Sequence, residues 1–282
     1  RPRTSYIDTI TAHSCHAEAM EIDYSSQSVP TAPYRQIAQD SASAVLFLHG
    51  ITGSPAAWFP IARSINRHGI SVSVPLLPGH GTRWQDLNAT TWSDWLAAAK
   101  AELEALSRTH SRVVVAGLSM GGALALALGT GDSPPDELVL INPALYIDSP
   151  LTPVLPVLKH VVASVPAIAG DIAHPDRCEY AYDRTPVAAI ASFASAQKAL
   201  RDDLWKIECP VSLFVSGRDS VVGPRTLRTL RSRLTQRPEI ISLRRSRHVA
   251  TLDNDAGIIA EAILEKATSS GRAAAGSPEA GE

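Results

Sequence analysis

The fold is decided by the stretch Arg112-Val-Val-Val-Ala-Gly-Leu-Ser-Met-Gly-Gly-Ala-Leu-Ala-Leu-Ala-Leu128. Its first part is apolar and β-branched, which predicts a buried strand, and its last part suits a buried helix. Between them, Gly117-Leu-Ser-Met-Gly121 fits the pattern G-x-S-x-G, in which a serine occupies a sharp strand-to-helix turn. Side chains two residues before and after the serine would collide, so glycine is expected there. The turn presents the Ser119 hydroxyl at a helix N-terminus, where developing negative charge is stabilised.

Strand and helix patterns alternate on both sides of this stretch. Short apolar runs predict further strands at 44–48, 70–74, 138–141, 211–215 and 240–243. Helical spacing of apolar residues predicts helices at 55–68, 94–107, 121–128, 224–236 and 254–267. Such alternation indicates an α/β fold with a mostly parallel central sheet, covered by helices on both faces.

One segment interrupts this rhythm. Residues 144–205 are too long for a single crossover, and five prolines fall between Pro150 and Pro175. We interpret 144–205 as a cap or lid inserted over the carboxyl edge of the sheet, where ligands bind in such folds. The core is then formed by 1–143 and 206–268. A short strand is possible at Ala17–Ile22, and the small and polar residues of 269–282 predict a disordered tail.

The composition limits the class of protein. Of the 282 residues, 45% are hydrophobic and 19% charged, which is typical of a globular chain with a large core. The net charge of −2 argues against a nucleic-acid partner, and no uncharged apolar run reaches the ~18 residues of a membrane span. Three scattered cysteines suggest a reducing compartment, so we expect a cytoplasmic protein. The chain begins Arg1-Pro-Arg3 without an initiator methionine, which leaves a missing native N-terminus and a removed signal peptide open.

A serine nucleophile needs a base and an orienting acid, which in this fold follow it in the order acid, then histidine. Asp219, in Ser216-Gly-Arg-Asp-Ser220, comes just after the strand predicted at 211–215. His248 follows the strand at 240–243, so both residues fall at the edge where Ser119 is expected. We therefore predict a Ser119–His248–Asp219 triad. Asp148 is an alternative acid, whereas Asp253 is expected to be structural.

A tetrahedral intermediate also requires two N–H donors for its oxyanion. One is expected from Met120, which follows the nucleophile, and the other from the loop after the strand at 44–48. That loop reads His49-Gly-Ile-Thr-Gly-Ser54, and its glycines, Gly50 among them, allow close approach of the backbone to a substrate. We expect the N–H of Ile51 to be the second donor and His49 to shape the loop. The alternative is a simple glycine turn.

Five blocks in this order resemble the bacterial carboxylesterase and monoacylglycerol lipase branch of the α/β-hydrolases. They are His49-Gly-Ile-Thr-Gly-Ser-Pro55, Leu77-Pro-Gly-His-Gly-Thr82, Thr91-Trp-Ser-Asp-Trp95, Gly117-Leu-Ser-Met-Gly-Gly122 and His248-Val-Ala-Thr-Leu-Asp253. The resemblance covers about residues 44–267. It implies a capped α/β-hydrolase fold and hydrolysis of small acyl esters of short or medium chain length, with monoacylglycerols among the candidates.

The same resemblance implies no cofactor and no metal, with Ser119, Asp219 and His248 as triad and Ile51 and Met120 as oxyanion donors. Ile51 stands where this branch often has phenylalanine, which bears on the acyl pocket. A thioesterase or acyltransferase with the same triad, and a non-catalytic ligand-binding protein on the same scaffold, remain alternatives. The sequence does not indicate an oligomeric state. The arginine-rich stretch 225–247 is either a solvated face or a basic surface that attracts an anionic partner or a lipid interface. The segment His13-Ser-Cys-His16 lacks further ligands for a metal.

Overall fold

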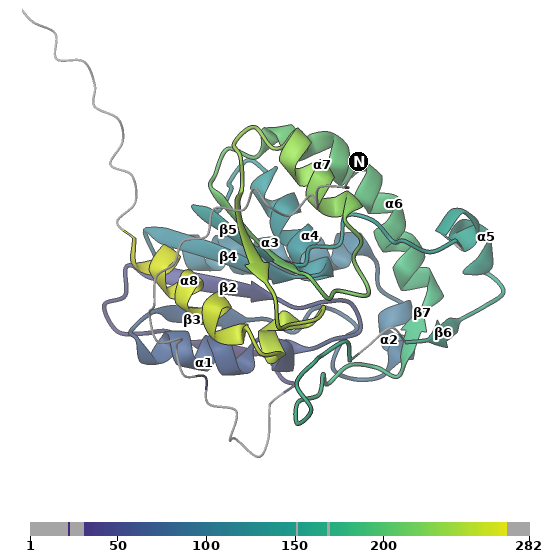
Figure 1. Ribbon diagram of the computed structural model, residues 1–282, viewed down its shortest axis with the longest axis horizontal. Coiled ribbons are helices and arrows are strands. Elements are labelled where there is room, and N and C mark those ends of the chain that lie inside the picture. Colours follow the sequence, from purple (N-terminus) through teal and green to yellow (C-terminus); the bar gives the residue numbers. More distant parts are fainter. Residues whose placement is uncertain (1–21, 23–30, 151, 168–169, 270–282) are drawn as a thin grey trace, which may run out of the picture.

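The computed structural model describes residue 22 and residues 31–150, 152–167 and 170–269. Its centre is a seven-stranded sheet with the order β1-β3-β2-β4-β5-β8-β9 (Figure 1). The strands are β1 (Tyr34–Gln36), β2 (Ser43–Leu48), β3 (Ser71–Val74), β4 (Arg112–Leu118), β5 (Glu137–Ile141), β8 (Val211–Ser216) and β9 (Glu239–Leu243). Neighbouring strands are parallel except β1, which runs antiparallel to β3.

All six strands predicted from apolar runs are present, so the prediction of a mostly parallel sheet is confirmed. The sequence did not reveal β1, because its residues are polar and mostly exposed. Alternation along β2 explains why the inner strands appear as continuous apolar runs. Val45 and Phe47 join the hydrophobic cluster on one face, whereas Leu46 and Leu48 join the cluster on the other.

Helices cover both faces of the sheet (Figure 1). One face packs against α1 (Phe59–Arg67) and α8 (Ala256–Thr268). The other packs against α3 (Trp92–Ser107), α4 (Met120–Gly129), α6 (Val187–Asp203) and α7 (Arg225–Arg233). Each fully buried leucine, isoleucine or phenylalanine contributes about 1.5–3 kcal/mol. This three-layer packing fixes the carboxyl ends of the parallel strands along one edge.

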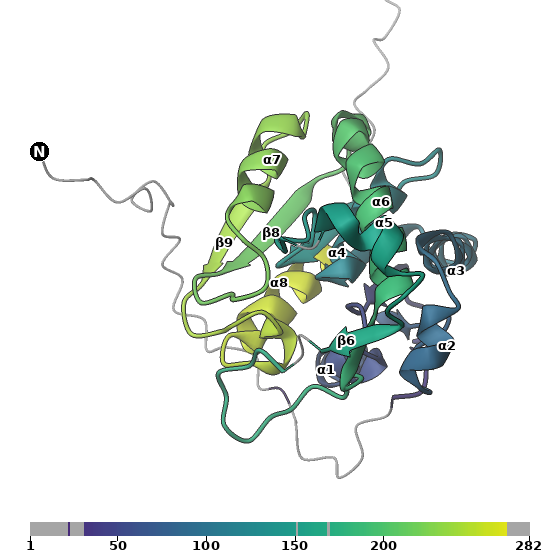
Figure 2. The same cartoon turned by 90° about the vertical axis from the view of Figure 1, so that its right-hand side faces the viewer.

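Residues 144–205 contain α5 (Leu155–Leu158) and the antiparallel pair β6 (Ser164–Pro166) and β7 (Arg184–Pro186). Figures 1 and 2 show these elements together at one end of the molecule. A small separate cluster includes Leu155 and Val187. The long helix α6 behaves differently, because Phe193 and Leu200 pack into the main core. Neither α6 nor the short helix α2 (Trp84–Asn88) was expected from the sequence.

Some predictions concern residues outside the described part of the chain. They are the strand at Ala17–Ile22 apart from Ile22, the tail apart from Ser269, and the segment His13–His16. Within the described residues, no helix combines the length and apolar character needed to cross a bilayer.

Candidate active site

Ser119 lies between the end of β4 and the first residue of α4. Its backbone is strained, with φ 55° and ψ −114°, a combination that a residue with a side chain rarely adopts. A Cβ at Gly117 would collide with the backbone of Gly121, and one at Gly121 would collide with the backbone of Leu48. The expected steric need for both glycines is therefore confirmed. The sharp turn places Ser119 at the N-terminus of α4, at the carboxyl edge of the sheet.

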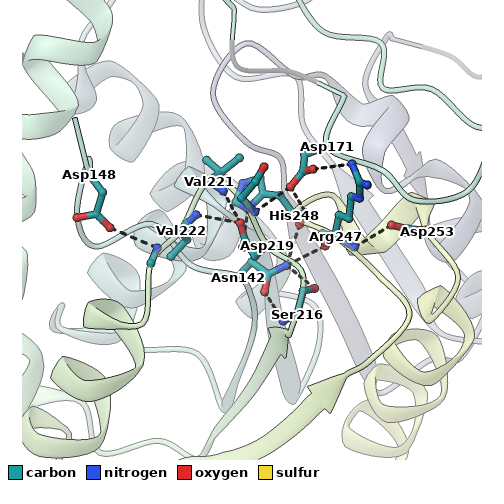
Figure 3. A network of polar contacts seen from close by, with 12 residues as sticks. Asn142, Asp148, Asp171, Ser216, Asp219, Val221, Val222, Arg247, His248 and Asp253 are labelled. Carbon is teal, nitrogen blue, oxygen red and sulfur yellow. Dashed lines mark hydrogen bonds and ion pairs between the residues drawn. The ribbon is translucent and has the colours of Figure 1, made fainter. Parts of the chain in front are cut away.

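Asp219 and His248 form a direct pair at the same edge (Figure 3). The Asp219 Oδ2 atom lies 2.9 Å from His248 Nδ1. The other carboxylate oxygen accepts hydrogen bonds from the N–H groups of Val221 at 2.7 Å and Val222 at 2.9 Å, which fix its orientation. Because Asp219 accepts at Nδ1, the neutral imidazole carries its proton there and keeps Nε2 as the basic nitrogen.

The relation of the Ser119 side chain to this pair differs from that of a fully formed triad. Among the described residues, no hydrogen bond connects Ser119 Oγ with His248. In structures without a substrate, catalytic hydrogen bonds are often long and tighten only in the complex. Ser119 is 8% and His248 7% exposed, so both residues are buried.

Asn142 links the serine strand to the acid and base loops, and the sequence prediction missed it. It follows β5, which lies between β4 and β8 in the sheet. Its amide nitrogen donates to His248 O at 2.8 Å and to Ser216 Oγ at 2.9 Å, while its amide oxygen accepts from Ser216 N at 2.8 Å. Ser119 N in turn donates to Ile141 O at 3.0 Å. The sequence signal for this role is weak, since it consists of an asparagine directly after an apolar strand.

The loop after β2 lies against the serine. A Cβ at Gly50 would lie 3.5 Å from Ser119 Cβ, so glycine allows this close approach. Thr52 in the same loop has a positive φ of 63°. Within the described residues, neither Ile51 N–H nor Met120 N–H donates a hydrogen bond to the protein. The assignment of these two groups as oxyanion donors stays a prediction.

His49 shapes this loop, as the sequence suggested. Its ring is completely buried and lies between Gly50 O, 3.0 Å from Nδ1, and Leu77 N, which donates to Nε2 at 3.2 Å. Burial lowers the pKa of His49 to about 4. The neighbouring His80 has a pKa of about 3, lowered first by burial and then by the proximity of His49. Both rings are therefore neutral at pH 7.

The rival acids occupy other positions. Asp148 Oδ2 accepts a hydrogen bond from Gly223 N at 3.3 Å, and Figure 3 shows it on the far side of Asp219 from His248. Asp253 is buried and accepts from the N–H groups of Ala173 and Arg247, which agrees with the structural role expected for it. The geometry thus pairs the base with Asp219.

The segment 170–182 contacts the loops on both sides of the site. Asp171 accepts hydrogen bonds from Ser220 N at 3.1 Å and His248 N at 3.2 Å through the same oxygen. Burial raises the pKa of Asp171, but these hydrogen bonds outweigh that effect and leave the pKa below its ordinary value. Tyr182 N donates to Thr52 O at 3.0 Å. No periodicity marks such contacts, so the sequence prediction missed Asp171.

A cavity of about 220 Å³ lies next to Asp219, which forms part of its wall. It is mostly apolar, and its walls come from β8, the acid loop and the start of α7. Among the residues that line it are Leu213, Val215, Asp219, Val222 and Leu227. The described residues contain no group of three or more side chains suited to hold a metal ion.

Comparison with known families decides the classification. A model described as the alpha/beta hydrolase family matches residues 45–262. The chain belongs to this family. Among curated proteins, this chain is similar to a thermostable monoacylglycerol lipase of Bacillus sp. (strain H-257), with 34% identity over 81% of this chain and 91% of the relative. It is also 24% identical to a carboxylesterase of Bacillus subtilis (strain 168), over 79% of this chain and 91% of that protein.

Solved alpha/beta hydrolase structures agree. A structure from a study of the metagenome-derived lipolytic enzymes LipS and LipT superposes with a TM-score of 0.78 at 34% identity, covering 84% of this chain and 98% of the other. The monoacylglycerol lipase of Paleococcus ferrophilus shares the fold, with a TM-score of 0.69 at 19% identity over 83% and 97% of the two chains. The prediction of an α/β-hydrolase fold is therefore confirmed.

Proposed function

We propose that the protein is a serine hydrolase of carboxylic esters that acts on short- to medium-chain acyl esters, including monoacylglycerols. The observation that carries this proposal is the Asp219–His248 pair at the sheet edge where the strained Ser119 lies. A histidine oriented by a carboxylate is the base that an alcohol nucleophile requires. The similarity to a monoacylglycerol lipase and a carboxylesterase supports the ester class.

In the proposed reaction, Ser119 Oγ attacks the ester carbonyl carbon while His248 Nε2 takes the hydroxyl proton. The carbonyl π electrons move to the oxygen, and the N–H groups of Ile51 and Met120 stabilise that oxyanion. Collapse of the intermediate breaks the bond to the alcohol, which leaves with the proton from His248. A water molecule then repeats the sequence on the acyl-serine and releases the acid. Asp219 stabilises the imidazolium in both halves.

The segment 144–205 serves in this proposal as a cap over a core made of 1–143 and 206–268. Its outer surface carries exposed apolar side chains at Val154, Val157 and Val161. Each methylene of an acyl chain that is buried beneath such a cap contributes about 0.8 kcal/mol. This contribution predicts a preference for esters with longer acyl chains over esters with very short ones.

The test combines activity with covalent labelling. We expect p-nitrophenyl and glycerol esters of increasing chain length to be hydrolysed, and a fluorophosphonate to add to Ser119 in intact-protein and peptide mass spectrometry. Ser119→Ala should lose at least about 10⁴-fold in kcat and all labelling. Ser133→Ala is the control, because that exposed serine lies between α4 and the start of β5, away from the carboxyl edge of the sheet, and should retain both.

Three outcomes would contradict the proposal in different ways. No adduct on Ser119 together with no hydrolysis would favour the ligand-binding protein. Much faster cleavage of thioesters than of matched oxygen esters would favour a thioesterase. Transfer of the acyl group to added alcohols in preference to water would favour an acyltransferase.

A further inference from the structure

The segment that follows β6 reaches both loops that hold the acid and the base. Asp171 Oδ2 accepts one hydrogen bond from Ser220 N, the residue after Asp219, and another from His248 N. The backbone of Asp171 adds a third contact, because its carbonyl accepts from Val249 N at 3.1 Å. One residue of the cap therefore bridges the acid loop after β8 and the base loop after β9.

A second carboxylate fixes the segment that carries Asp171. Asp253 accepts hydrogen bonds from Ala173 N at 2.7 Å and His174 N at 3.0 Å, and also from Arg247 N at 2.9 Å. Arg177 donates to the Asp253 carbonyl at 3.1 Å. The segment is thus held beside both neighbours of His248, through Asp253 at Arg247 and directly at Val249. Asp171 cannot shift without loss of several hydrogen bonds.

We propose that Asp171 is a positioning residue of the triad, through which the cap sets the separation of Asp219 and His248. This inference rests on the proposed function. Asp219 orients the imidazole only while its own loop stays in place, and Asp171 holds that loop by the N–H of Ser220. A displacement of about 1 Å in such a constellation can cost about 10²-fold in rate. The side chain of Asp171 consequently couples the cap to the loops that carry Asp219 and His248 (Figure 3).

The charge of Asp171 predicts an effect on the pH dependence of activity that a general loosening of the two loops would not produce. The groups that face His248 are Asp219 from the acid loop, Asp171 and Glu179 from the cap, and Arg247 from its own loop. Asp171 is negative and stabilises the imidazolium. If its charge is removed, the imidazolium becomes less stable and the base is neutral at lower pH. The acidic limb of kcat/KM should therefore move to lower pH.

The test compares Asp171→Asn and Asp171→Ala with Asp176→Asn. Asp176 is exposed in the same segment, and its side chain is not part of either loop, so this variant matches the loss of charge. We expect kcat to fall about 10-fold in Asp171→Asn and about 10²-fold in Asp171→Ala, with KM for a short soluble ester changed less than ~3-fold. The acidic midpoint should fall by ~0.5 pH unit in Asp171→Asn and stay unchanged in Asp176→Asn.

A readout without substrate separates this inference from the proposed function. The His248 Nδ1–H proton in its hydrogen bond to Asp219 should give a downfield ¹H resonance in the wild type and in Asp176→Asn. That resonance should shift or broaden in both Asp171 variants. If the wild type shows no ester hydrolysis, the proposed function fails, while the resonance still tests positioning. Unchanged kcat, or a lower kcat with an unmoved midpoint and resonance, would overturn the role of Asp171.

Discussion

The two halves of the candidate active site are held by different kinds of interaction. At the serine, backbone sterics require two glycines, because a Cβ at Gly117 or Gly121 would collide with neighbouring backbone. At Asp219 and His248, long-range side-chain hydrogen bonds from Asn142 and Asp171 fix two loops that have little regular structure. The turn that carries Ser119 is therefore encoded locally, whereas the Asp219–His248 pair depends on residues far away in the sequence.

The largest expected effect comes from disrupting the Asp219–His248 pair. Asp219→Asn keeps the shape of the side chain but favours the wrong imidazole tautomer, so kcat should fall about 10⁴-fold, or roughly 5.5 kcal/mol of transition-state stabilisation. The measurement is steady-state hydrolysis of a p-nitrophenyl ester. Asp148→Asn is the control and should keep activity within a few-fold. Near-normal activity of Asp219→Asn combined with a large loss in Asp148→Asn would reassign the acid.

A single methyl group added at Gly121 should destabilise the turn that carries Ser119. Gly121→Ala places a Cβ against the backbone of Leu48 and His49, so we expect a loss of at least about 3 kcal/mol in the free energy of unfolding. Denaturant titration measures it. Gly131→Ala is the matched control, since that exposed glycine after α4 has room for a methyl group and should change stability by less than ~0.5 kcal/mol. Equal stability of the two variants would mean that the elbow is not sterically determined.

Asn142→Ala should weaken the junction between the halves. It removes the hydrogen bonds to His248 O and Ser216 N, which leaves buried polar groups without partners. We expect kcat to fall by about 10–100-fold and the free energy of unfolding by ~2 kcal/mol. Asn66→Ala, which removes one half-buried hydrogen bond to Ile70 O far from the site, should lower stability slightly and leave kcat unchanged. A catalytic loss that is equal in both variants would argue against the linking role.

The smallest effect concerns the strain at the nucleophile. Ser119 has φ 55°, so Ser119→Gly should be more stable than Ser119→Ala by ~1 kcal/mol, because both lack the hydroxyl and only glycine relaxes the backbone. Thermal unfolding of the two inactive variants measures the difference. A more stable alanine variant would show that the entropy lost by glycine exceeds the strain released.

The sequence predicted six of the seven strands of the central sheet and most of the helices beside them, because apolar runs and helical spacing report burial directly. It did not predict β1, whose polar residues form a strand only because β3 offers a free edge. It also did not predict α6. The prolines of 144–205 made the whole segment look irregular, so no helix was predicted there. The apolar side chains Phe193 and Leu200 of α6 pack only against the folded core.

The sequence by itself indicated the candidate catalytic residues: a serine between two glycines, and an aspartate and a histidine that each follow a strand. Those signals are local, since sterics at a sharp turn and the direction of parallel strands act over a few residues. Only the tertiary structure decided that His248 pairs with Asp219 and not with Asp148, and that Asn142 and Asp171 hold this pair. Hydrogen bonds between residues tens of positions apart depend on the packing of strands and cap, and no pattern along the chain records their geometry.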